Sequence, residues 1–210
     1  MTDHSPPPSG RPAPHALVRA LLALSSGILR IERYVLTGLM SLLVLLVLLN
    51  VITRYGGAPI YWIDEASVYC VVWLTFVGAS IMTRLRLDFS VGMLTEKLSL
   101  RGQRIARAIS TSLVLVFGLS MVVMCWLWLD PVGLARYGFD VQEFAAGTFN
   151  FLYTERTQTL NWPVWALQMV LPLFATTMSL HATANLLEDL SLTPRRQFPE
   201  FPVTSPDMVN

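Results

Sequence analysis

The side chains best placed for chemistry in this sequence are the adjacent carboxylates Asp64 and Glu65, which follow Trp62 and lie ten or more positions after Arg54. If a helix begins here, two acids in its first turn complement the positive end of the helix dipole. The same carboxylates could instead form an ion pair with Arg54 or contact a partner protein. The sequence leaves these interpretations open, and none of them requires catalysis.

Other groups that support catalysis or bind cofactors are scarce. The histidines are His4, His15 and His181, whereas a haem-binding four-helix cytochrome needs pairs of buried histidines. Cys70 and Cys125 lie in apolar stretches and form no Cys-x-x-Cys motif. Nucleotide-binding loops and catalytic-triad patterns are not apparent. We therefore expect a protein that is not an enzyme, with no cofactor, metal site or nucleic-acid partner, and we expect His181 to pack with a hydrogen bond.

Long uncharged stretches dominate the chain, which is 53% hydrophobic and 14% charged. An α-helix needs about 20 apolar residues to cross a bilayer, and a charge at mid-span costs roughly 2.5–3.5 kcal/mol. Four stretches lack Asp, Glu, Lys and Arg, namely 34–53, 66–83, 108–129 and 157–187. They predict an all-α integral membrane protein whose four transmembrane helices cover about 34–54, 63–83, 108–129 and 162–184, within one membrane domain over 34–190.

The flanking segments have a different character. Residues 1–15 and 191–210 are rich in proline, which predicts disordered tails. Over residues 16–33 a 100° step places Arg19, Arg30 and Arg33 in one arc opposite leucine and isoleucine. This pattern predicts an amphipathic interfacial helix whose arginines contact lipid phosphates, with packing on a partner as the alternative. In the outer segment 130–161 we expect one or two short interfacial helices.

The distribution of basic residues predicts the orientation. With both termini in the cytoplasm, twelve basic residues fall inside and only Arg54, Arg136 and Arg156 fall outside. This bias follows the positive-inside rule, and most of the tryptophans fall at the outer ends of the spans, where indole rings prefer to lie. The inner arginines Arg101, Arg104 and Arg107 are also expected to contact lipid phosphates.

Two further features concern helix packing. Thr75, Gly78 and Ala79 form a ridge of small residues in the second span, which predicts a close helix–helix contact within the chain or with a partner. Pro172 should kink the fourth span. Ion-coupled transport normally places an ionisable group or a matched pair of helix breaks near the midplane, and this sequence has neither. The chain thus has the features of a bundle that supports another protein.

The order and spacing of several short motifs resemble those of the small membrane subunit of tripartite ATP-independent periplasmic (TRAP) transporters. The motifs are Asn50-Val51-Ile52-Thr53-Arg54-Tyr55, Trp62-Ile63-Asp64-Glu65-Ala66, Tyr69-x-x-x-Trp73-Leu74-Thr75-Phe76-x-Gly78-Ala79, then Arg84, and Leu160-x-Trp162-Pro163-x-Trp165 followed by Leu171-Pro172. The sequence departs from the family pattern at Asp88, where histidine is usual, at Gly92, where aspartate is usual, and at Val68, where arginine is common. These differences suggest a divergent branch.

The resemblance implies a specific function. In that family the large membrane subunit carries the substrate and sodium sites, a periplasmic binding protein captures the solute, often an organic acid, and the small subunit braces the large one in the bacterial inner membrane. Subunit docking and helix packing would then involve Arg54, Trp62, Asp64, Glu65, Thr75, Gly78, Ala79 and Arg84. The alternatives are a homo-oligomeric small transporter or channel and, on weaker grounds, a membrane redox subunit. The sequence does not identify the solute.

Overall fold

The computed structural model describes residues 16–87, 99–190, 192–194, 196 and 198. Its regular elements are helices, and Arg156 and Pro163 form an isolated β-bridge. Four helical stretches are long and apolar enough to cross a membrane, which confirms the predicted all-α architecture with four candidate spans. The helices are α1 (Ala16–Tyr55), α2 (Trp62–Leu85), α4 (Leu100–Leu129), α5 (Pro131–Arg136), α6 (Val141–Thr148), α7 (Val164–Gln168) and α8 (Val170–Asp189).

The first helix differs from the sequence-based division into an interfacial helix over 16–33 and a span over 34–54. Helix α1 runs through both segments as one element of 40 residues, about 60 Å long at 1.5 Å per residue. It contains many leucines and no proline, so nothing in the sequence ends the helix at Arg33. The placement of residues 16–33 on the membrane surface stays a prediction.

The fourth span is interrupted as the sequence predicted. Helix α7 ends at Gln168 and α8 begins at Val170. Pro172 explains this break, because its ring has no N–H to donate to the Gln168 carbonyl four residues earlier and would clash with it. The helix is therefore interrupted just before Pro172, where the sequence predicted a kink.

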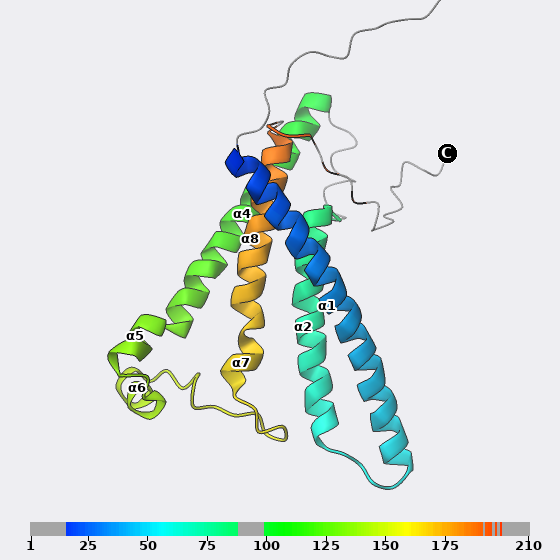
Figure 1. Ribbon diagram of the computed structural model, residues 1–210, viewed down its shortest axis with the longest axis vertical. Helices are drawn as coiled ribbons and strands as arrows, with labels where there is room; N and C mark the ends of the chain where they lie inside the picture. The colour runs from blue at the N-terminus through cyan, green and yellow to red at the C-terminus, as the bar shows by residue number, and fades with distance from the viewer. Residues whose placement is uncertain (1–15, 88–98, 191, 195, 197, 199–210) are drawn as a thin grey trace, which may run out of the picture.

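The four long helices pack as two pairs. Helix α1 packs along α2, and α4 packs along α8, while α2 and α8 join the pairs. Figure 1 shows that the helices meet at the end where α1 begins and α8 ends, and that they separate toward the opposite end. We call these the terminal end and the loop end. At the α4–α8 crossing a Cβ on Gly118 would lie 2.6 Å from the Ser179 hydroxyl oxygen, so this glycine permits the close approach.

Short helices close the loop end, as expected for residues 130–161. Helices α5 and α6 follow α4 and pack around Phe144, which is completely buried. The Phe144 ring meets those of Tyr137 and Tyr153 at centroid distances of 5.8 and 6.0 Å, and the Tyr153 ring lies 6.3 Å from that of Trp165. This aromatic chain attaches the outer segment to α7.

The predicted tails are described only in part. Residues 1–15 lie outside the described residues, as do Asp88 and Gly92. The C-terminal segment was expected to be disordered from residue 191, but Thr193 is buried, Arg196 contacts α1 and Phe198 lies over Arg84. These three residues therefore pack on the terminal end of the bundle.

Candidate functional site

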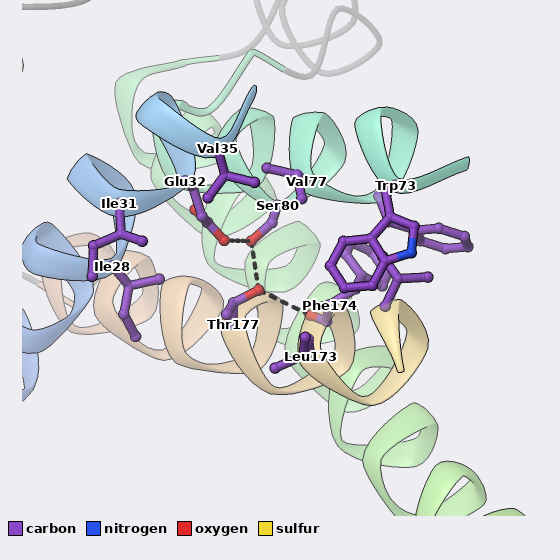
Figure 2. Close-up of a pocket in the computed structure, with 12 residues that line it drawn as sticks. Ile28, Ile31, Glu32, Val35, Trp73, Val77, Ser80, Leu173, Phe174 and Thr177 are labelled. Carbon is purple, nitrogen blue, oxygen red and sulfur yellow. Dashed lines mark hydrogen bonds between the residues drawn. The ribbon is translucent and has the colours of Figure 1, made fainter. Parts of the chain in front are cut away.

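A chain of hydrogen bonds links three helices inside the bundle. The Nδ1 atom of His181 in α8 lies 2.8 Å from Ser25 Oγ, and its Nε2 atom lies 3.1 Å from Glu32 Oε2, both on α1. Ser80 of α2 donates to Glu32 Oε1 at 2.6 Å and lies 2.8 Å from the Thr177 hydroxyl of α8. Figure 2 shows the Glu32–Ser80–Thr177 part. We call these five residues the buried polar core.

Serine, histidine and carboxylate in series are the components of a hydrolase triad, so this possibility must be tested against the geometry. Ser25 and His181 have no exposed surface, and a nucleophile needs access to its substrate. The hydrogen bonds of Ser25 and Glu32 with His181 instead join α1 to α8. The arrangement is therefore suited to holding helices together, in line with the prediction that His181 packs with a hydrogen bond.

Electrostatics explain why the buried polar core matters for stability. Glu32 is only 7% exposed, and its two carboxylate oxygens bind Ser80 and His181. Removing one partner leaves the buried polar atom of the other without its hydrogen bond, which costs about 1–3 kcal/mol. Each member of the pair thus depends on the other, although they lie on different helices.

A second buried cluster lies nearer the terminal end, and we call it the arginine cluster. Arg84 of α2 donates to Asn185 and, at 2.7 Å, to Glu188, both on α8. Arg86 pairs with Glu188 and Asp189. Arg86 ends α2 in a left-handed conformation, with its N–H bonded back to the last turn of the helix. The cluster connects the end of α2 to the end of α8.

An apolar groove lies beside the buried polar core. It has a volume of about 270 Å³ and lies between α1, α2 and α8 (Figure 2). Ile28 and Ile31 line it from α1, Trp73 lines it from α2, and Leu173 and Phe174 line it from α8. The indole N–H of Trp73 donates to the Leu167 carbonyl at 2.9 Å, so the ring orientation is fixed. The lining is suited to an apolar group.

The paired acids at the loop end have separate partners. Asp64 accepts hydrogen bonds from Arg54 and Asn50, each at 2.6 Å, and the Arg54 Nε donates to the Asn50 side chain at 3.0 Å. This result confirms the ion pair considered from the sequence. The side chains of Arg54 and Asp64 are 59% and 50% exposed, so the ion pair itself contributes only about 0–1 kcal/mol to stability.

Glu65 holds the outer loop. Its carboxylate accepts the backbone N–H groups of Gln158, Thr159 and Leu160 at 3.0, 2.8 and 3.0 Å, and also the Thr159 hydroxyl. Consecutive N–H groups that converge on one carboxylate form an anion-binding concavity. Glu65 therefore fixes the segment before α7 to the start of α2.

The other predicted docking residues lie in different environments. Gly78 faces α1, since a Cβ there would lie 3.8 Å from Leu36. Thr75 is exposed, and its hydroxyl donates to the Val71 carbonyl of its own helix, while Trp62 is 41% exposed and Ala79 is half-buried. Arg84 is 2% exposed and binds Asn185 and Glu188 of α8, so it connects helices within the chain. A docking role for it stays a prediction.

The predicted lipid-contacting arginines lie in two groups. Arg19 and Arg30 are exposed on α1, and Arg33 is half-buried there. The second group comprises Arg101, Arg104 and Arg107, which are exposed in the first turns of α4. Because α4 begins at Leu100, it extends the predicted span by about two turns. Their contact with lipid stays a prediction.

Several residues that the structure brings together in the bundle carry no distinctive sequence pattern. Glu32, Ser80 and Glu188 were not singled out, because each is an ordinary polar residue in its own segment. The one available signal was that Ser25 and Glu32 lie seven residues apart and therefore on one face of the helix. Within the described residues, no group of three His, Cys, Asp or Glu could hold a metal ion.

Comparison with known proteins gives consistent results. Residues 43–192 match the family model described as the DctQ component of tripartite ATP-independent periplasmic transporters. A TRAP transporter small permease protein of Haemophilus influenzae is 32% identical over 90 residues, which are 42% of this chain and 56% of that protein. A C4-dicarboxylate TRAP transporter small permease protein, DctQ, of Vibrio cholerae is 24% identical over 114 residues, 54% of this chain and 49% of that protein. The chain thus spans about half the length of these curated relatives, and no solved structure matches it.

Proposed function

The chain belongs to the family of DctQ components of TRAP transporters, and from this premise we propose that it binds the large membrane subunit and braces it during sodium-driven solute uptake. As a small permease component, it is a multi-pass membrane protein and not an enzyme. In the proposed assembly it carries no cofactor, and the large subunit carries the sodium sites. A periplasmic binding protein delivers the solute.

The buried polar core is the observation that carries the proposal of a brace. Both carboxylate oxygens of Glu32 and both ring nitrogens of His181 have partners on other helices. A transport site must instead offer its polar groups to an ion or solute near the midplane. Polar groups that bind one another favour a fixed element against which another subunit moves.

We further propose the contact surface, the membrane orientation and the solute class of the complex. The exposed residues Arg54, Trp62 and Asp64 at the loop end, together with the exposed Thr75 near the middle of α2, contact the large subunit. The chain lies in the bacterial inner membrane with both termini in the cytoplasm. The solute is an organic acid, a choice supported by the C4-dicarboxylate named for the Vibrio cholerae relative.

Co-expression with the large subunit tests this function. We expect the two chains to co-purify, and we expect proteoliposomes with both subunits and the binding protein to accumulate solute in a sodium gradient. Liposomes with the large subunit alone should accumulate little. Robust uptake without this chain would contradict the bracing role, and solute flux through this chain alone would favour the stand-alone transporter or channel.

A further inference from the structure

Arg196, in the C-terminal segment, is held at a defined place on α1. Its Nη1 atom donates to Ser26 Oγ at 2.6 Å and to the Leu22 carbonyl at 3.3 Å. Ser26 donates its own hydrogen to the same carbonyl at 2.8 Å, so its oxygen accepts from Arg196. The guanidinium is therefore positioned by α1, although 170 residues separate it from Ser26.

The contacts with Ser26 and Leu22 leave part of the Arg196 guanidinium available for a ligand. Arg196 is exposed, and no described residue accepts a hydrogen bond from its Nε or Nη2 atom. These two nitrogens form the planar edge that binds a phosphate through parallel hydrogen bonds. Because Ser26 and Leu22 already fix the side chain, less conformational entropy is lost when a ligand binds.

Arg30 lies one helical turn after Ser26, the residue that binds Arg196. Ser26 and Arg30 are four residues apart, so they share a helix face about 6 Å apart along the axis. Arg30 is exposed, and no described carboxylate lies within ion-pair distance of it. Because long helical side chains point back toward the N-terminus, an Arg30 side chain directed at the preceding turn reaches the anion that the Arg196 guanidinium faces.

The depth of this position identifies the source of the anion. Arg33 and Arg54 lie 21 residues apart on α1, about 31 Å, which matches a hydrocarbon core of about 30 Å. Arg30 and Ser26 lie about 5 and 11 Å beyond Arg33, at the level of the lipid headgroups. We propose that Arg30 and Arg196 together bind the phosphate of one anionic phospholipid at the terminal end of the bundle.

Native mass spectrometry of the full chain, purified in dodecyl maltoside, tests this proposal. The probes are dioleoylphosphatidylglycerol and dioleoylphosphatidylcholine at equal concentrations. We expect wild type to retain phosphatidylglycerol preferentially, and we expect Arg30→Gln and Arg196→Gln each to weaken retention about tenfold or more, as for the loss of one charge-assisted hydrogen bond. Arg136→Gln, at an exposed arginine of the loop end, should leave retention unchanged.

Circular dichroism of each variant separates loss of the site from loss of the fold. Equal retention of the two lipids by wild type would overturn the proposal, and so would full retention by folded Arg30→Gln or Arg196→Gln. Displacement of the lipid by millimolar inorganic phosphate would identify a free-phosphate site instead. Since the isolated chain is used, these outcomes are independent of whether it binds a large subunit.

Discussion

Replacing His181 should strongly destabilise the bundle, because the side chain is fully buried and bonded to two residues of α1. His181→Ala leaves the Glu32 carboxylate with the Ser80 hydroxyl as its remaining partner in the buried polar core. A buried polar group that loses its hydrogen-bond partner costs about 1–3 kcal/mol. We therefore expect a loss of this size in the free energy of unfolding, measured in mixed detergent micelles by far-ultraviolet circular dichroism.

A double-mutant cycle separates the pair interaction from simple loss of packing. Glu32→Met combined with His181→Leu replaces both partners by apolar side chains of similar size, so neither side chain of the pair is left without its partner. The double variant should be more stable than the sum of the two single variants predicts, by roughly 1–3 kcal/mol. Thr176→Ala, at an exposed threonine bonded to its own helix, serves as the control and should cost less than 1 kcal/mol. Strictly additive effects in the cycle would refute the proposed coupling.

Two other contacts give sharp predictions. Gly118→Ala should lower the free energy of unfolding by about 1–3 kcal/mol, because the new Cβ would lie 2.6 Å from Ser179 Oγ. The control Gly38→Ala, where the new Cβ meets no atom within 4 Å, should be neutral or stabilising. Equal effects of the two substitutions would contradict the close α4–α8 crossing. Glu65→Gln should weaken the contacts that hold the outer loop, so trypsin should cleave after the exposed Arg156 faster than in wild type. An unchanged cleavage rate would show that Glu65 does not hold the loop.

The sequence was sufficient for the spans and for the break in the last of them. Lipid provides no hydrogen-bond partners for the backbone, so a long uncharged stretch has to be helical, whatever its tertiary contacts. Pro172 acts through its own ring on the preceding turn, and its effect is therefore also local. The ion pair of Arg54 and Asp64 could be considered for a similar reason, since a short loop joins the helices that carry them.

The buried contacts could not be predicted, because they depend on which helix faces meet. Glu32 and His181 lie 149 residues apart, and Arg84 and Glu188 lie 104 apart. From the sequence alone, Glu32 is one of several charged residues in an amphipathic segment, and Arg84 is one basic residue of a cytoplasmic flank. Only the packing of α8 between α2 and α4 gives these side chains their buried partners.

The contact between α2 and α8 offers a direct test of whether the chain is a fixed element. The hydroxyl oxygens of Ser80 and Thr177 lie 2.8 Å apart, so cysteines at both positions should form a disulfide upon oxidation, in a background where Cys70 and Cys125 are replaced by alanine. A brace works without movement between these helices. We therefore expect the oxidised double-cysteine chain to support the same solute uptake, with its large subunit, as the reduced chain. The single-cysteine variants control for the lost Ser80 hydroxyl. If oxidation stops uptake in the double variant and in neither single variant, α2 and α8 must move during transport, and the bracing role is wrong.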